Sequence, residues 1–151
     1  MSRRVALPVV TAAYLAIVAW ATLGPVPWDA VGYEAPFGVL TPSIWFERST
    51  WAIGSPFEFT ANIVMFVPIG VLFALIAGPR KWLGALAAAG TASLAIELVQ
   101  IPLADRISDP RDLLANTGGA VIGIALVGLG RLVRLAWHAM NRSADRARVA
   151  R

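Results

Sequence analysis

The sequence predicts an all-α integral membrane protein, a four-helix bundle whose N- and C-termini both face the cytoplasm. Three observations support this fold class. First, 58% of the 151 residues are hydrophobic and 15% are charged, whereas soluble domains average about 45–50% and about 25%. Second, the apolar residues gather in four long stretches, and Glu97 is the one formally charged residue inside them. Third, basic residues concentrate on one side of these stretches. A water-soluble globule and a disordered chain are both excluded.

A transmembrane helix needs about 17–25 predominantly apolar residues. Four stretches meet this requirement within one expected domain of residues 1–151, and they cover residues 5–23, 59–77, 82–101 and 113–129. Arg3-Arg4 before the first stretch and Ala19-Trp20-Ala21 within it resemble a signal peptide with its cleavage site. Because the apolar run exceeds the usual length of about 7–15 residues, we expect an uncleaved first helix.

The orientation follows from the distribution of Lys and Arg, which are enriched in cytoplasmic segments. Of the 13 basic residues, only Arg48, Arg106 and Arg111 fall outside the N-terminus, the 78–81 turn and the 131–151 tail. These three segments alternate with the loops on the opposite side, so both termini are predicted to be cytoplasmic. The loop 24–58 and the connection between the last two spans are predicted to be external.

The outer loop, residues 24–58, is rich in Pro, Gly and aromatic residues, including Trp28, Trp45 and Trp51. This composition argues against free solvation and favours a segment lying in the outer membrane interface. Two interpretations remain open here: a connector that follows the membrane surface, and a lid over a site between the helices.

Polar residues from distant parts of the chain converge at one depth. Under the predicted topology, Asn62, Glu97, Gln100, Asp112 and Asn116 all lie within roughly 6 Å of the outer boundary, at a rise of about 1.5 Å per helical residue. Ionisable residues in a membrane are costly and mark a site or a packing contact. We therefore expect a polar pocket at the outer ends of the second, third and fourth helices.

Helix spacing places these residues on defined faces. Ser93, Glu97 and Gln100 share one face of the third helix, and Asp109, Asp112 and Asn116 lead onto the fourth. The fourth helix continues with Gly119 and Gly123, a spacing that permits close helix approach. The third helix offers small residues for this approach, and we expect the fourth helix to pack against them, namely Ala85, Ala88, Ala89 and Ala92.

Three motifs within residues 62–123 resemble those of a known family. The resemblance rests on Asn62-x-x-x-Phe66-x-Pro68-x-Gly70, on Glu97-x-x-Gln100, and on Arg106-x-x-Asp109-x-x-Asp112-x-x-x-Asn116-x-x-Gly119-x-x-x-Gly123. In this order, the motifs resemble the VanZ-like family over about residues 62–123. These are small bacterial membrane proteins named after a determinant of low-level teicoplanin resistance. The resemblance implies a multi-pass protein of the bacterial cytoplasmic (inner) membrane and a phenotype class, and it supplies no reaction.

The candidate ligand-binding residues are Asn62, Glu97, Gln100, Arg106, Asp109, Asp112 and Asn116. Structural alternatives accompany them. Asp109, followed by Pro110, is best explained as a helix N-cap, and Asp112 either completes a capping box or points into the pocket. Asn62 and Asn116 either serve the site or bond to neighbouring helices. Glu97 near hydrocarbon needs a cation or a proton, and Arg106 is its expected partner.

The tail, residues 131–151, is predicted to extend the fourth helix. Arg131, Arg134, His138 and Arg142 recur on one helical face, which suits contact with anionic headgroups of the inner leaflet. Nucleic-acid binding is not expected from this pattern.

Three functions remain open. The first is binding of a lipid headgroup, a lipid-linked envelope precursor or a lipoglycopeptide, with an effect on glycopeptide susceptibility. The second is an intramembrane enzyme that uses Glu97 as general acid or base, with an oxygen-ligated Mg²⁺ or Ca²⁺ on the aspartates. The third is a structural or assembly protein. With no cysteine and one histidine, thiol nucleophiles, disulfides, Cys-ligated metals and His-rich metal sites are not expected, and no cofactor is expected.

Overall fold

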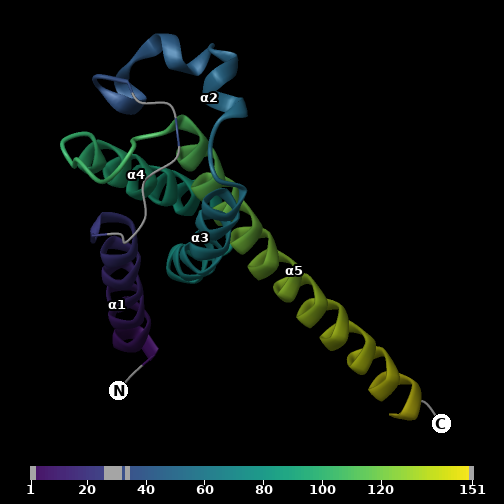
Figure 1. The fold of residues 1–151 in the computed structure, drawn as a ribbon. Helices are drawn as coiled ribbons and strands as arrows, with labels where there is room; N and C mark the ends of the chain where they lie inside the picture. The colour runs from purple at the N-terminus through teal and green to yellow at the C-terminus, as the bar shows by residue number, and fades with distance from the viewer. Residues whose placement is uncertain (1–2, 26–31, 33–34, 150–151) are drawn as a thin grey trace.

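The computed structural model describes residues 3–25, 32 and 35–149. It contains α1 (Arg3–Leu23), two 3₁₀ turns, η1 (Gly38–Leu40) and η2 (Pro42–Trp45), and then α2 (Arg48–Ala52), α3 (Pro56–Ala77), α4 (Trp82–Gln100) and α5 (Pro110–Val149). Within these residues the chain forms helices and no strands (Figure 1). Four of the helices are long and apolar enough to cross a membrane. The predicted all-α class with four spans is therefore confirmed.

Two of the helices, α3 and α5, begin three residues before the predicted spans. α3 begins at Pro56 rather than Phe59, because the Ser55 hydroxyl accepts the N–H of Glu58 at 3.3 Å and Pro56 occupies the first helical position. α5 begins at Pro110 rather than Leu113, and it runs unbroken for 40 residues to Val149. The predicted continuation of the fourth helix into the tail is thus confirmed as helix.

The surface of the long helices is apolar. Large exposed side chains occur on each of them, among them Trp20, Val64, Leu83 and Leu126. A water-soluble protein would not expose apolar side chains along every helix, whereas lipid favours such a surface. The buried core of Val18, Phe66, Ile69, Ala89 and Ala120 draws on all four helices.

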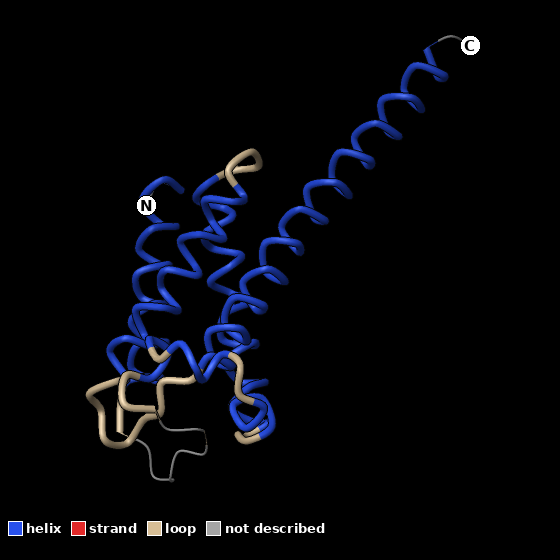
Figure 2. The backbone as a smooth tube through the Cα atoms, turned by 90° about the horizontal axis from the view of Figure 1, so that it is seen from above, coloured by secondary structure: helices blue, strands red, loops and turns tan. Residues whose placement is uncertain are grey.

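The loops that connect the helices lie at two opposite ends of the bundle (Figure 2). The α3–α4 turn lies at the same end as the start of α1, and the far end of α5 projects in that direction away from the bundle. The described part of the 24–58 loop and the α4–α5 connection lie at the opposite end, which we call the loop end. This arrangement is the one that the predicted topology requires, and its orientation in a membrane stays a prediction.

The small residues of α5 pack against α3 rather than against α4. A Cβ atom added to Gly119 or Gly123 would collide with the carbonyl oxygens of Ile63 and Val67, and one added to Gly70 would collide with that of Ala120. The expected approach of Gly119 and Gly123 to the alanines of α4 is therefore wrong. Gly70 on α3 supplies a second small residue, so the two backbones come into direct contact at these positions.

α4 packs into the bundle through one buried face of alanines and polar residues. Ala85, Ala89, Ser93, Glu97 and Gln100 are buried, while Ala88 is exposed. The predicted common face of Ser93, Glu97 and Gln100 is confirmed, and it continues down the helix through the two alanines.

The 24–58 loop folds back onto the α4–α5 connection. The N–H of Val39 donates to the Ser108 hydroxyl at 3.3 Å, and the indoles of Trp45 and Trp51 donate to the carbonyls of Val39 and Trp45. Gly38 has a φ of +47°, and a Cβ atom there would overlap the Ser108 side chain. The loop therefore covers the connection around Ser108. Trp28 lies outside the described residues.

Candidate functional site

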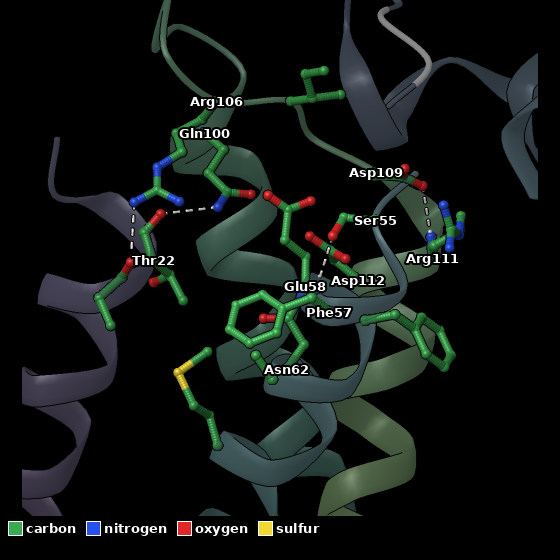
Figure 3. Close-up of a pocket in the computed structure, with 15 residues that line it drawn as sticks. Thr22, Ser55, Phe57, Glu58, Asn62, Gln100, Arg106, Asp109, Arg111 and Asp112 are labelled. Atoms are coloured by element: carbon green, nitrogen blue, oxygen red, sulfur yellow. Dashed lines mark hydrogen bonds between the residues drawn. The ribbon is translucent and has the colours of Figure 1, made fainter. Parts of the chain in front are cut away.

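A cavity of about 230 Å³ opens at the loop end, between the end of α1, the start of α3 and the α4–α5 connection (Figure 3). Its wall mixes charged, amide and apolar side chains. The lining residues that bear on its chemistry are Asn62, Gln100, Arg106, Asp109 and Asp112, together with Ser55, Glu58, Arg111, Phe57, Phe59 and Met65. Five of the seven residues predicted for the site therefore lie around one cavity, although they come from α3, α4, the α4–α5 connection and α5.

Asn62 and Asp112 contact each other across the α3–α5 interface. The Asn62 side chain hydrogen-bonds the Asp112 carboxyl group, and Asp109 and Glu58 lie close enough to Asp112 to repel it electrostatically. Of the two roles considered for Asp112, the structure shows the one in the pocket. The pocket therefore gathers three carboxyl groups, from Glu58, Asp109 and Asp112.

Asp109 caps α5. Its Oδ1 accepts the N–H of Arg111 at 2.8 Å, and Pro110 fills the first helical position. Burial raises the pKa of Asp109, the nearby Glu58 raises it further, and the Arg111 N–H and charge oppose this rise. The expected N-cap role is confirmed, and the same carboxyl group also borders the cavity.

Glu97 lies behind the pocket wall. It is 1% exposed, and its Oε2 accepts the main-chain N–H of Asp109 at 2.9 Å. A capping box would place Asp112 on that N–H, but Glu97 of α4 occupies the position instead. Glu97 thus fixes the start of α5 to the end of α4, and it is not among the residues that line the cavity.

Asn116 lies deeper between the same helices. Its Nδ2 donates to the Ser93 hydroxyl at 3.0 Å, and the side chain is 1% exposed. The interhelical bond considered for Asn116 is what the structure shows. Like Glu97, Asn116 lies outside the cavity lining.

The expected pairing of Arg106 with Glu97 is wrong. One guanidinium nitrogen of Arg106 donates to the carbonyls of Ala21 at 3.0 Å and Gly24 at 2.6 Å. Gln100 acts in the same way, because its Nε2 donates to the carbonyl of Thr22 at 3.0 Å. The last carbonyls of a helix have no partner within that helix. Arg106 and Gln100 therefore hold the C-terminal end of α1, which forms one wall of the pocket.

A model of the VanZ/LLP1 family matches residues 11–132 of the chain. The chain belongs to the VanZ/LLP1 family. The match extends from α1 to the part of α5 beyond the bundle, so it includes every residue of the pocket. Comparison with curated proteins and with solved structures found no match. With its four membrane-length helices, this VanZ/LLP1 chain is a multi-pass membrane protein.

Two charged residues of the VanZ/LLP1 pocket were not predicted, Glu58 and Arg111. Glu58 faces the cavity from the first turn of α3. Ser55-x-x-Glu58 is a capping signature, and it could have predicted that α3 begins here and that Glu58 belongs to the site. Arg111 donates to the carbonyl of Ile53, and its guanidinium lies 5.8 Å from the centre of the Phe59 ring. No local sequence signal indicates that contact.

The carboxylates of the site do not form a metal-binding cluster. In the described part of the chain, no group of three or more acidic, His or Cys side chains is arranged to hold one. The geometry therefore gives no support to the Mg²⁺ or Ca²⁺ site considered for the aspartates.

Proposed function

We propose that this VanZ/LLP1 protein binds the polar headgroup of an amphiphile in the cavity at the loop end. Through this binding it would change the response of the bacterial cytoplasmic membrane and envelope to glycopeptides of the teicoplanin type. The amphiphile is a membrane lipid, a lipid-linked envelope precursor or a lipoglycopeptide.

The observation that carries this proposal is the mixed wall of the cavity. Carboxylates, guanidinium groups and amides meet there beside Phe57, Phe59 and Met65, at the end of helices whose outer faces are apolar. Ligand sites combine an apolar lining with a few converging polar groups. A pocket of this kind accepts a polar headgroup while acyl chains remain in the surrounding lipid.

The enzymatic alternative with Glu97 is less well supported. A general acid or base must come within hydrogen-bonding reach of the reacting group, directly or through one water. Glu97 is buried behind the lining, and one of its oxygens already accepts the Asp109 N–H. Its contacts are those of a residue that positions α5.

The test combines bound lipid and phenotype. Wild type, Asn62→Leu and Asp112→Asn are purified in mild detergent, and co-purified amphiphiles are identified by native mass spectrometry. Asp105→Asn serves as the control, because Asp105 is exposed on the same connection and does not line the cavity. We expect the two pocket variants to stay folded, to lose the bound amphiphile and to lose any effect on teicoplanin susceptibility. Retention of both by folded pocket variants would contradict the proposal.

A further inference from the structure

The pocket holds more hydrogen-bond acceptors than free donors. Its carboxyl groups belong to Glu58, Asp109 and Asp112, and a carboxylate only accepts hydrogen bonds. The two guanidinium groups are already engaged: Arg106 donates to carbonyls at the end of α1, and Arg111 donates to Ile53 while facing the Phe59 ring. The cations of the pocket therefore serve mainly its own walls.

A second observation is independent of the carboxylates. Gln100 is 6% exposed, and its Oε1 is buried without a hydrogen-bond partner. Its Nε2 points to Thr22, so the amide group presents the opposite atom, the oxygen, toward the pocket side (Figure 3). A buried acceptor without a donor is costly. Gln100 thus presents an acceptor that is satisfied only if a donor enters the pocket.

We propose that the headgroup bound here carries a primary ammonium group, which donates to Gln100 Oε1 and to the carboxylates of Glu58 and Asp112. An ammonium group has three donors and no acceptor, which matches this set of acceptors. The inference rests on the proposed function, and it selects amine-bearing amphiphiles over anionic ones.

Among the residues that line the pocket, a buried donor also lacks a partner, the Nε of Arg106. An oxygen next to the ammonium group, such as a phosphodiester oxygen, supplies the acceptor that this atom needs. Two sources share the required chemistry: an aminophospholipid of the membrane and the free amine of another amphiphile.

The probes separate the ammonium group from the rest of the molecule. Binding to the purified protein is measured with phosphatidylethanolamine, with phosphatidylcholine, whose nitrogen has no N–H, with phosphatidylglycerol, which has no amine, and with dodecylamine, which has no phosphate. We expect phosphatidylethanolamine to bind at least about tenfold more tightly than phosphatidylcholine or phosphatidylglycerol. If dodecylamine binds and phosphatidylethanolamine does not, the natural ligand is an amine other than an aminophospholipid, and the ammonium site is still supported.

Two isosteric variants test the contacts. Glu58→Gln and Asp112→Asn remove a charge and keep the shape, so each should weaken phosphatidylethanolamine binding about tenfold while Asp105→Asn leaves it unchanged. Thermal unfolding in detergent shows whether each variant is folded, and a variant that fails to fold is replaced by the other. Equal binding of all three phospholipids, lost together in Asp112→Asn, would overturn the ammonium inference and leave the proposed function standing. No binding of any probe that depends on the pocket would overturn both.

Discussion

At the scale of single residues, Glu97 shows how a buried carboxyl group is used for architecture. It bridges 12 residues of chain to accept the N–H of Asp109, the residue that caps α5. The Ser108 side chain hydrogen-bonds the same carboxyl group. Glu97 therefore anchors the connection between α4 and α5 through two hydrogen bonds. These bonds position the start of α5, where Asp109 and Asp112 face the cavity.

Substitutions of Glu97 separate its oxygen from its charge. Glu97→Gln keeps an acceptor for the Asp109 N–H, so we expect a melting temperature in detergent close to that of wild type. Glu97→Leu leaves that N–H buried and unpaired, which costs about 1–3 kcal/mol, and should lower the melting temperature clearly. If Glu97→Leu were as stable as Glu97→Gln, the bond to Asp109 would contribute nothing.

The sequence could predict at which end of the helices the site residues lie, but it could not predict their hydrogen-bond partners. Helix spacing along the sequence placed Asn62, Gln100 and Asp112 at one end, because depth depends only on position within a span. The partner of Arg106 could not be predicted in the same way. Arg106 bonds to main-chain carbonyls at the end of α1, and such carbonyls are present in every helix whatever its side chains.

At the scale of elements, the α3–α5 pair is defined by glycines that admit no side chain. Small residues at four-residue spacing correctly predicted a close helix approach, but the alanines of α4 were the wrong partner, because α3 offers Gly70 as well. The choice of α3 depends on how the whole bundle packs. The sequence pattern of one helix does not contain that information.

Neighbouring glycines provide a matched test of this packing. A Cβ atom at Gly119 would overlap the Ile63 carbonyl, whereas one at Gly118 would meet nothing within 4 Å. We expect Gly119→Ala to lower stability by about 1–3 kcal/mol through overpacking. Gly118→Ala should be neutral or slightly stabilising, because alanine favours helix. Thermal unfolding of the two variants side by side checks the difference, and equal stabilities would contradict the close approach.

α5 is also longer than a membrane requires. Its 40 residues extend about 60 Å at 1.5 Å per residue, about twice the hydrocarbon thickness of a bilayer. Arg131 donates to the carbonyl of Ala74 at the end of α3, and beyond it Arg142 bonds to His138 of its own helix. The bundle therefore holds α5 up to about Arg131.

Deletion of residues 141–151 tests that limit. Since this segment lies ten residues beyond Arg131, we expect the shortened protein to keep its melting temperature in detergent. Loss of stability on deletion would show that the tail contributes to the bundle. As a control, Arg131→Gln removes the bond to Ala74 and should reduce stability slightly.

At the scale of the whole molecule, the predicted orientation can be tested with exposed positions at opposite ends. Ser43 lies at the loop end and Lys81 in the α3–α4 turn, and both are exposed. In intact cells, Ser43→Cys should react with a membrane-impermeant thiol reagent, and Lys81→Cys should react only after the membrane is opened. The chain has no native cysteine, so no background labelling is expected. The reverse pattern would move the pocket to the cytoplasmic face.

Because pocket residues cap α1, ligand binding in the pocket is linked to the attachment of α1 to the bundle. Gln100 and Arg106 both line the cavity and hold the carbonyls of Ala21, Thr22 and Gly24. A molecule that competes for these donors weakens the attachment of α1, and by reciprocity any displacement of α1 releases two donors toward that molecule. A ligand that uses only Gln100 Oε1 leaves the attachment intact. Binding of an anionic ligand to these donors would therefore be coupled to the attachment of α1, whereas binding of an ammonium group to Gln100 Oε1 would not.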